Sequence, residues 1–171
     1  CKVDIDHALE KIEWSTLFFF MALFILVCGA EECGLMAKIG GVLQLMGDWP
    51  VPVIVLVIMW GSALAAAVMN NVSFTAAMVT VVASFISVTP AFRDSVPCQH
   101  LLWWGLALSV CLGGNASLVG AAANLVTVGI AEKNGHKVTF GQFLGYGVPV
   151  AVGSMVLASI YILVRYYLVC R

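Results

Sequence analysis

The segment VPVIVLVIMWGSALAAAVM, residues 51–69, runs into the polar string Asn70-Asn71-Val72-Ser73-Phe74-Thr75 and continues as AAMVTVVASFISV at 76–88. Residues 51–88 could form one very long helix or two short ones. The polar cluster at the midpoint favours two, because amide and hydroxyl groups at membrane depth must be buried in protein or line a cavity. The sequence therefore predicts a helical hairpin over 51–88, with its turn at 70–73.

The length of the two arms bears on how this hairpin sits in a bilayer. Each arm has only about 14–19 residues, which is marginal for crossing a hydrocarbon core of about 30 Å. We therefore expect a re-entrant hairpin, which enters the bilayer and returns to the same side. Small residues on both arms allow close helix contact; they are Ser62, Ala63, Ala65, Ala66, Ala67, Ala76 and Ala77.

Composition places the whole chain in a membrane. Of its 171 residues 62% are hydrophobic and 10% are charged, against about 25% charged residues in ordinary soluble domains. No Asp, Glu, Lys or Arg occurs between Asp48 and Arg93, or between Asp94 and Glu132. The sequence therefore predicts an all-α polytopic, integral multi-pass membrane protein. It excludes a soluble enzyme and a disordered chain, and the net charge of −1 gives no reason to expect nucleic acid as a partner.

Other elements are expected on either side of the hairpin. Residues 1–13 have the apolar spacing of an amphipathic helix at the interface, and 14–30 is long enough to form a first span. Residues 33–49 are predicted to form an interfacial arm helix. The segment 89–99, with two prolines and an Arg-Asp pair, is expected to be a loop, and 142–168 to be a final span.

A second interruption lies within the apolar stretch 100–131. Gly113-Gly114-Asn115-Ala116-Ser117 occurs near its centre and Gly120 follows. Because Gly-Gly-Asn is costly inside a continuous helix, the sequence predicts a broken transmembrane helix. Its halves are expected at about 101–112 and 117–131, followed by a hydrated loop at 132–137.

The two interruptions together predict one polar site at mid-depth of the bilayer. In secondary transporters, half-helix N-termini face anions, while unwound carbonyls and Asn or Ser side chains coordinate Na⁺. The competing interpretation is that these side chains only form interhelical hydrogen bonds and that the glycines only permit packing. Na⁺ is expected near Asn71 and Asn115. The candidate substrate- and ion-binding residues are Asn70, Asn71, Ser73, Thr75, Gly113, Gly114, Asn115, Ser117 and Asn124.

Catalytic and metal-binding patterns are missing from the sequence. The six cysteines form no CxxC pair, and the three histidines lack metal-ligand spacing. Inside the predicted spans there is no His/Asp/Glu cluster or Ser-His pairing that acid–base or nucleophilic catalysis would need. We therefore expect no enzyme and no cofactor, apart from Na⁺ or H⁺ as a coupling ion.

Three strings resemble the ion transporter superfamily: EWSTLFFFMALFILVCGAEECGL at 13–35, NNVSFTAAMVTVV at 70–82 and CLGGNASLVGAAANLVTVGIAE at 111–132. They are most similar to the arsenite permease and Na⁺/H⁺ antiporter (ArsB/NhaD) group, which includes the melanosomal P protein, and more distantly to the citrate and dicarboxylate (divalent anion:sodium symporter) carriers. The resemblance covers about residues 9–168. It implies two inverted repeats, each with a re-entrant hairpin and a broken helix. The chain, 1–171, looks like a single transporter domain, the C-terminal repeat of a larger carrier. The missing N-terminal repeat and a second copy in a homodimer are then implied partners.

The resemblance also allows the family's motifs to be compared with this chain position by position. The dicarboxylate branch has Ser-Asn-Thr at the hairpin tip, where this chain has Asn70-Asn71-Val72, so that only Asn71 matches. The permease branch commonly has Asp-Asn there, and Asn70 stands where that acid would be. The absence of the acid speaks against proton or Na⁺ coupling through this repeat. Ala121-Ala122-Ala123-Asn124, in place of Thr-Pro-Pro-Asn, favours the permease branch.

The residues and the resemblance together predict a secondary transporter in the lipid bilayer. It would move a small anion or inorganic ion, of the arsenite, citrate/dicarboxylate or Na⁺/H⁺ class, by elevator-type alternating access. The alternative is a channel-like or non-transporting membrane protein that keeps the fold.

Overall fold

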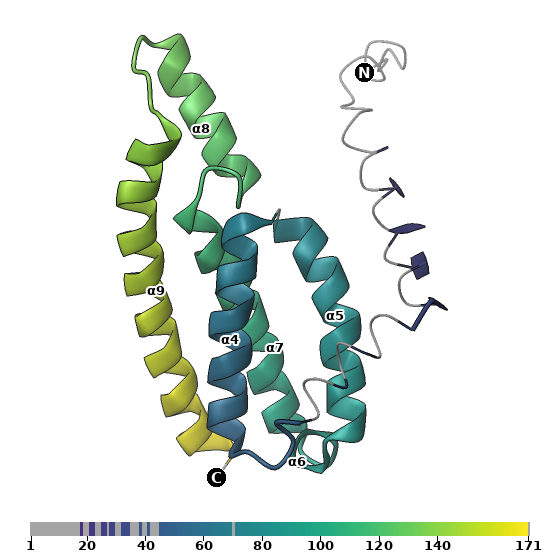
Figure 1. Ribbon diagram of the computed structural model, residues 1–171. Coiled ribbons are helices and arrows are strands. Elements are labelled where there is room, and N and C mark those ends of the chain that lie inside the picture. The colour runs from purple at the N-terminus through teal and green to yellow at the C-terminus, as the bar shows by residue number, and fades with distance from the viewer. Residues whose placement is uncertain are drawn as a thin grey trace, which may run out of the picture.

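The computed structural model describes residues 18, 21–22, 25–26, 28–29, 32–34, 38, 41, 45–69 and 71–170. In the chain order of Figure 1 the named elements are α4 (Val51–Val68), α5 (Asn71–Val88), α6 (Pro90–Arg93), α7 (Val96–Gly113), η1 (Gly114–Ala116), α8 (Ala122–Lys133) and α9 (Phe140–Val169). No strand occurs among the described residues. The elements predicted over 1–13, 14–30 and 33–49 lie mostly outside the described residues.

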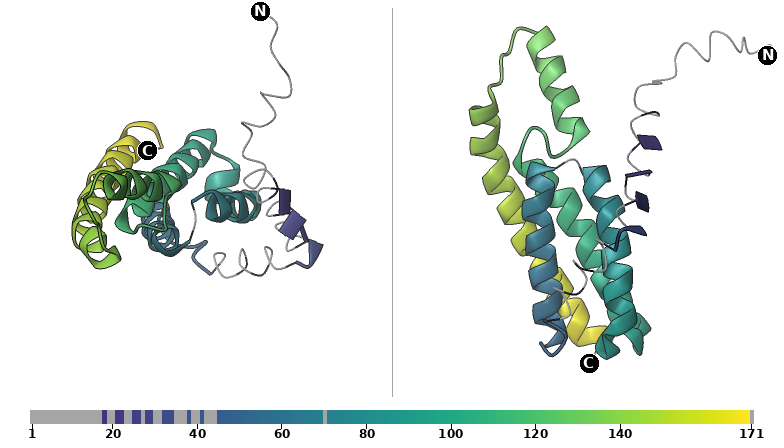
Figure 2. Two further views of the ribbon diagram at one scale, coloured as in Figure 1. Left: turned by 90° about the horizontal axis from the view of Figure 1, so that it is seen from above. Right: turned by 45° about the vertical axis from the view of Figure 1, so that its right-hand side comes forward.

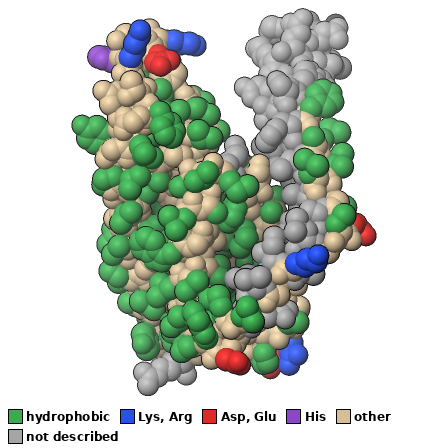
Figure 3. Space-filling model, in the orientation of Figure 1, with side chains coloured by type: hydrophobic (Ala, Val, Ile, Leu, Met, Phe, Trp, Pro, Cys, Tyr) green, Lys and Arg blue, Asp and Glu red, His purple; other side chains and the backbone are tan. Residues whose placement is uncertain are grey.

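Four helical segments are long and apolar enough to cross a membrane: Val51–Val68, Asn71–Val88, Val96–Ala116 and Phe140–Val169. Figure 3 shows the surface over α4 and α9 as largely hydrophobic, with charged side chains gathered at its two ends. Exposed charged residues flank these helices: Glu132, Lys133 and Lys137 lie at the end of α8 and after it, Asp48 lies before α4, and Arg93 and Asp94, paired at 3.1 Å, lie after α5. The loop predicted at 132–137 begins only at 134, because α8 extends to Lys133. The prediction of an all-α polytopic membrane protein is confirmed.

The hairpin over 51–88 is present, but its turn is tighter than predicted. Helix α4 ends at Val68 and α5 already begins at Asn71, so Val72 and Ser73 lie in the first turn of a helix. The backbone N–H of Asn71 donates to the Gly120 carbonyl at 3.3 Å. This bond between distant residues satisfies an N–H donor that the start of a helix otherwise leaves without a partner. Helix α5 can therefore begin directly after the bend.

The arms of the hairpin are shorter than α9. Each arm has 18 residues, or about 27 Å, whereas the 30 residues of α9 extend about 45 Å. Figure 2 shows α8 and the start of α9 reaching beyond the hairpin tip, which lies beside the break between α7 and α8. The re-entrant insertion of this hairpin stays a prediction, and the difference in length is consistent with it.

The loop predicted over 89–99 is wrong, because it contains α6 and the first turn of α7. Pro90 and Pro97 each lie in the first turn of a helix, where a missing N–H costs no hydrogen bond. The prolines therefore begin helices here. The Gln99 side chain fixes the connection, since its Nε2 donates to the carbonyls of Phe92 and Arg93 at 3.0 and 3.2 Å.

Helix α7 contacts α4, α5 and α9. The break at its C-terminal end therefore lies beside the hairpin tip. An added Cβ at Gly105 would lie 3.1 Å from side-chain atoms of Met59 and Val55, so α4 and α7 pack closely there. The Trp60 Nε1 donates to the Ser159 hydroxyl at 3.2 Å and joins α4 to α9. The buried core includes Ile54, Val55, Met59, Val82, Phe85, Leu101, Leu102, Met155 and Ile162.

At the end of the bundle remote from the break, Cys170 follows α9 and packs against the core that includes Cys98. Burial, a hydrogen bond with Cys98 and the charge interaction with Cys98 together raise the pKa of the Cys170 thiol to about 12, and Arg165 opposes this rise. Because the thiolate is the nucleophile, Cys170 is expected to react with iodoacetamide at pH 8.5 at least about a hundredfold more slowly than glutathione, an ordinary thiol of pKa about 8.5.

Peptide mass spectrometry of time-quenched samples measures this rate. Cys98→Ala removes the hydrogen-bond partner and is expected to raise the reactivity of Cys170. A wild-type rate equal to that of glutathione would contradict the raised pKa.

Candidate functional site

The helix break lies where two separate parts of the chain meet. Helix α7 ends at Gly113, η1 (Gly114–Ala116) adds one 3₁₀ turn, and α8 begins at Ala122. The predicted break is confirmed, but the second half was expected from residue 117 and starts five residues later. Ser117 explains the delay, because its hydroxyl accepts from the Gly120 N–H at 3.0 Å and donates to the Ala67 carbonyl. A serine bonded in this way competes with helix formation.

Asn71 connects the hairpin tip to this break. With its amide oriented so that Nδ2 donates, the side chain reaches the carbonyls of Gly120 at 3.0 Å and Val110 at 3.1 Å. A Cβ added at Gly114 would lie 2.5–2.9 Å from three atoms of the Asn71 amide. The start of α5, the end of α7 and the extended segment before α8 therefore meet around one side chain.

Asn124 holds the other side of the break. Its Nδ2 donates to the Gly114 carbonyl at 3.1 Å and to the Ser117 carbonyl at 2.9 Å. Both N–H groups of this amide are thus used by the backbone, and so are those of Asn71. What the two asparagines retain for a ligand is their side-chain oxygens, the kind of ligand that hard cations take.

The glycines of the break serve close approach and not unusual backbone geometry. Gly113 and Gly114 have φ values of −63° and −60°, which are ordinary helical angles. An added Cβ at Gly113 would lie 2.5 Å from the Cα and carbonyl oxygen of Ala63, and one at Gly120 would lie 2.5 Å from the Gly114 oxygen. The α-helix ends at Gly113 as predicted, but a 3₁₀ turn continues it over Gly114–Ala116, so helical backbone is lost only at 117–121.

The structure brings most of the predicted site residues together. Asn71, Gly113, Gly114, Ser117 and Asn124 form the contacts around the break, and we call these five residues the break cluster. Asn115 is exposed beside it and lines a cavity with Asn124. Ser73 and Thr75 are half-buried on α5, where the Thr75 hydroxyl donates to the Asn71 carbonyl at 2.7 Å. Asn70 lies outside the described residues. The binding roles of all nine residues stay predictions.

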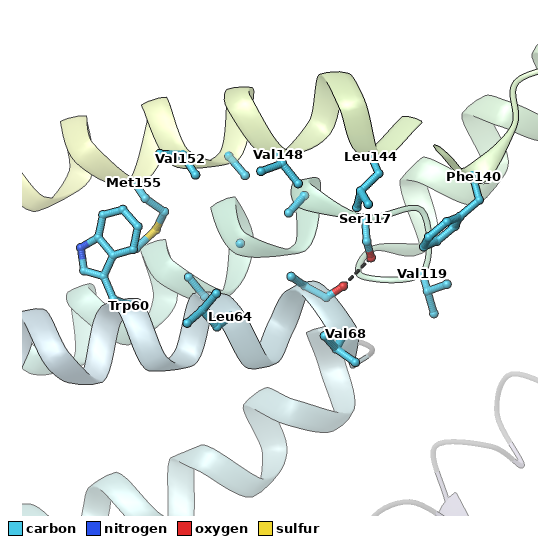
Figure 4. Close-up of a pocket in the computed structure, with 15 residues that line it drawn as sticks. Trp60, Leu64, Val68, Ser117, Val119, Phe140, Leu144, Val148, Val152 and Met155 are labelled. Carbon is cyan, nitrogen blue, oxygen red and sulfur yellow. Dashed lines mark hydrogen bonds between the residues drawn. The ribbon is translucent and has the colours of Figure 1, made fainter. Parts of the chain in front are cut away.

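Two cavities adjoin the break cluster. The first, of about 470 Å³, is lined almost entirely by apolar side chains of α4 and α9. Figure 4 shows Leu64, Val148 and Met155 lining it, with the Ser117 hydroxyl bonded across one end. Its lining has no charged side chain, and its polar donors are already used, the Ser117 hydroxyl by the Ala67 carbonyl and the Trp60 Nε1 by Ser159. It does not have the chemistry of an ion site.

The second cavity, of about 520 Å³, is more polar and lies between the break and α9. Gln142 and Tyr146 line it, and neither was among the candidate residues from the sequence. Their spacing of four residues, one helical turn, is the signal that could have found them. The full lining is Asn115, Asn124, Val138, Gln142, Phe143, Tyr146, Gly147 and Val150. Among the residues that the structure describes, no group of three or more His, Cys, Asp or Glu could hold a metal ion.

Comparison with known proteins gives consistent similarities. A family model described as "Citrate transporter" (CitMHS) matches residues 1–104. The P protein of Sus scrofa is 36% identical over 168 residues, covering 95% of this chain and 19% of that protein. The P protein of Homo sapiens is 34% identical over 171 residues, covering 97% and 20%.

Bacterial relatives are similar over the same region. An uncharacterized transporter of Synechocystis sp. is 29% identical over 172 residues, covering 94% of this chain and 38% of that protein. The chain therefore spans about a fifth of the P proteins and less than two fifths of this bacterial transporter. No solved structure matches it.

Proposed function

The chain belongs to the citrate transporter family, and on that premise we propose that the protein carrying it moves a small anion or inorganic ion across its membrane by alternating access. It is an integral multi-pass membrane protein of a transporter family, and its substrate is the part that the proposal adds. The candidate classes are citrate or a dicarboxylate, arsenite, and Na⁺ in exchange for H⁺.

The observation that carries the proposal is the contact between the hairpin tip and the helix break. Two interruptions far apart in sequence meet around Asn71, which bonds to Gly120 through its backbone and to Gly120 and Val110 through its side chain. Paired discontinuous segments of this kind form the binding sites of secondary transporters. A purely structural helix bundle has no need of irregular backbone at this position, and such backbone is costly unless it is buried or lines a cavity.

We propose distinct roles for the groups that remain unused at this site. The side-chain oxygens of Asn71 and Asn124 would face a coupling cation, Na⁺ in the simplest case, and Asn115 would face the solute. The chain would act as one of two inverted repeats, with the other repeat completing the site and a homodimer as the assembled form. No resident cofactor and no catalytic residue enters this mechanism.

Counterflow in proteoliposomes tests the proposal. The complete protein that carries this chain is reconstituted and loaded with unlabelled citrate, arsenite or Na⁺, and uptake of the same labelled solute is followed. A carrier is expected to show saturation and faster uptake from loaded vesicles, because the loaded site returns across the membrane faster than the empty one. Uptake without saturation or trans-stimulation would contradict the carrier and indicate a channel.

Residues 1–171 alone are expected to transport none of these solutes, because inverted-repeat carriers place their site between repeats. The same vesicles, loaded with the purified 171-residue chain at equal protein density, provide the measurement. Uptake at a rate like that of the complete protein would contradict the two-repeat proposal.

A further inference from the structure

The second cavity draws its polar groups from two elements, the break and the first turns of α9. Asn115 and Asn124 come from η1 and α8, while Gln142 and Tyr146 come from α9. Gly147 brings the two sides together, because an added Cβ there would lie 2.7 Å from the Asn115 carbonyl oxygen and 2.8 Å from that of Ala116. A larger residue at 147 would push α9 away from the break. The close approach places Tyr146 and Asn115 in the lining of the same cavity.

Counting donors shows what this cavity offers a ligand. The Gln142 Oε1 accepts from the Thr139 N–H at 3.0 Å in a capping box. Because this bond occupies the oxygen, the groups that Gln142 can offer a ligand are its two Nε2 N–H donors. Within the described part of the chain, neither the Tyr146 hydroxyl nor the Asn115 amide has a hydrogen-bond partner, and Tyr146 is 80% exposed. The lining contains no carboxylate. The cavity therefore presents uncompensated N–H and O–H donors from Asn115, Gln142 and Tyr146.

The charge at the rim of the cavity also favours an anion. Val138 belongs to the lining and directly follows the exposed residues 132–137, the end of α8 and the loop after it, which include Lys133, His136 and Lys137 against Glu132. Two lysines against one glutamate leave this rim positive, which raises the local concentration of anions. Donors combined with a positive rim match an oxyanion, whose charge strengthens each hydrogen bond that it accepts.

We propose that Gln142 and Tyr146 bind the transported solute directly through an oxyanion such as a carboxylate, so that the first turns of α9 select which solutes the carrier accepts. This inference rests on the proposed transport function and extends its site from the break cluster to α9. Asn71 and Asn124 then face the coupling cation with their oxygens, and α9 faces the anion with its donors.

Two substitutions remove these donors and leave the contacts that support the fold in place. Tyr146→Phe removes the hydroxyl and keeps the ring. Gln142→Glu keeps the oxygen that accepts from Thr139 and replaces the Nε2 donors by carboxylate oxygen. Tyr161→Phe is the matched control, because it makes the same change on the same helix at a hydroxyl that accepts from Arg165 at 3.0 Å, well away from the break.

The experiment measures binding and uptake of labelled citrate by the complete protein, with binding followed by equilibrium dialysis of nanodisc samples. Tyr146→Phe is expected to weaken binding and raise KM about tenfold, the loss typical of one hydrogen bond to a charged group. Gln142→Glu is expected to weaken binding and raise KM about a hundredfold, because a hydrogen-bond donor is replaced by a carboxylate that repels the anionic solute. Tyr161→Phe is expected to leave both values unchanged.

The outcomes distinguish this inference from the transport proposal. Wild-type binding that both variants leave unchanged would overturn the inference, whatever uptake shows. Binding that the variants weaken, in a protein without trans-stimulated uptake, would support the inference and contradict alternating access. A wild-type protein that does not bind citrate would overturn the oxyanion assignment, while uptake of arsenite or Na⁺ could still support transport.

Discussion

Asn71→Ala is expected to abolish transport in the complete protein, whereas Cys28→Ala is expected to change it little. The alanine removes the side-chain bonds to the Gly120 and Val110 carbonyls and the oxygen proposed to face the coupling cation. Two hydrogen bonds of about 1–1.5 kcal/mol each correspond to roughly a hundredfold loss of rate, and the loss of the ligand oxygen adds to it. The initial rate of citrate, arsenite or Na⁺ uptake is the measurement.

The comparison requires matched controls, because a folding defect would mimic a lost site. Asn134→Ala removes the same amide at the exposed end of α8, where it donates to the Ile130 carbonyl, and is expected to keep the wild-type rate. All variants are compared at equal surface expression. If Asn71→Ala expressed normally and kept more than about half of the wild-type rate, a change below the thermal energy of about 0.6 kcal/mol, the hairpin tip would be a packing feature.

Gly113→Ala is expected to have the largest effect on folding. The added Cβ would lie 2.5 Å from two backbone atoms of Ala63, and backbone in the middle of α4 cannot turn away as a flexible side chain can. Overpacking a core typically costs about 1–3 kcal/mol, and separating two helices along their contact is expected to reach the upper end of that range or exceed it. The yield of monodisperse protein and its melting temperature in detergent measure the effect.

Gly61→Ala and Gly153→Ala serve as controls for the same change. Both glycines lie within helices, α4 and α9, and an added Cβ at either would meet no atom within 4 Å. Since alanine is the better helix former by about 1 kcal/mol, both variants are expected to be at least as stable as the wild type. A Gly113→Ala protein with the melting temperature of these controls would refute the close approach of α4 and α7.

The sequence predicted the hairpin and the break because both depend on strong local signals. A polar run inside a long apolar segment is costly in lipid wherever it lies, so Asn70-Asn71 located the bend to within a few residues. The capping box of α9 similarly begins close to the predicted start of the last span, since Thr139 and Gln142 are neighbours in sequence. Signals of this kind need no knowledge of the rest of the fold.

What could not be predicted depends on contacts between distant residues. The late start of α8 follows from Ser117 bonding to Ala67, fifty residues earlier in the chain. The early start of α5 likewise follows from a distant contact, the bond from the Asn71 N–H to the Gly120 carbonyl. The role of Gly113 as a contact point for Ala63 is not visible in a sequence where it looks like a helix breaker. Gln142 and Tyr146 were missed because nothing local indicates that α9 passes beside Asn115.

Apart from the Gly120 N–H, which donates to the Ser117 hydroxyl, the side-chain hydrogen bonds around the break run in one direction. Asn71, Ser117 and Asn124 act as side-chain donors, and their acceptors are main-chain oxygens of Val110, Gly120, Ala67, Gly114 and Ser117. Every residue type carries a main-chain oxygen, so no substitution on the acceptor side deletes the bond itself. Genetic variation at this junction is thus constrained at the donors by hydrogen bonding and at the glycines by volume. An acceptor such as Val110 is free to change, provided that its replacement keeps the helix and its size.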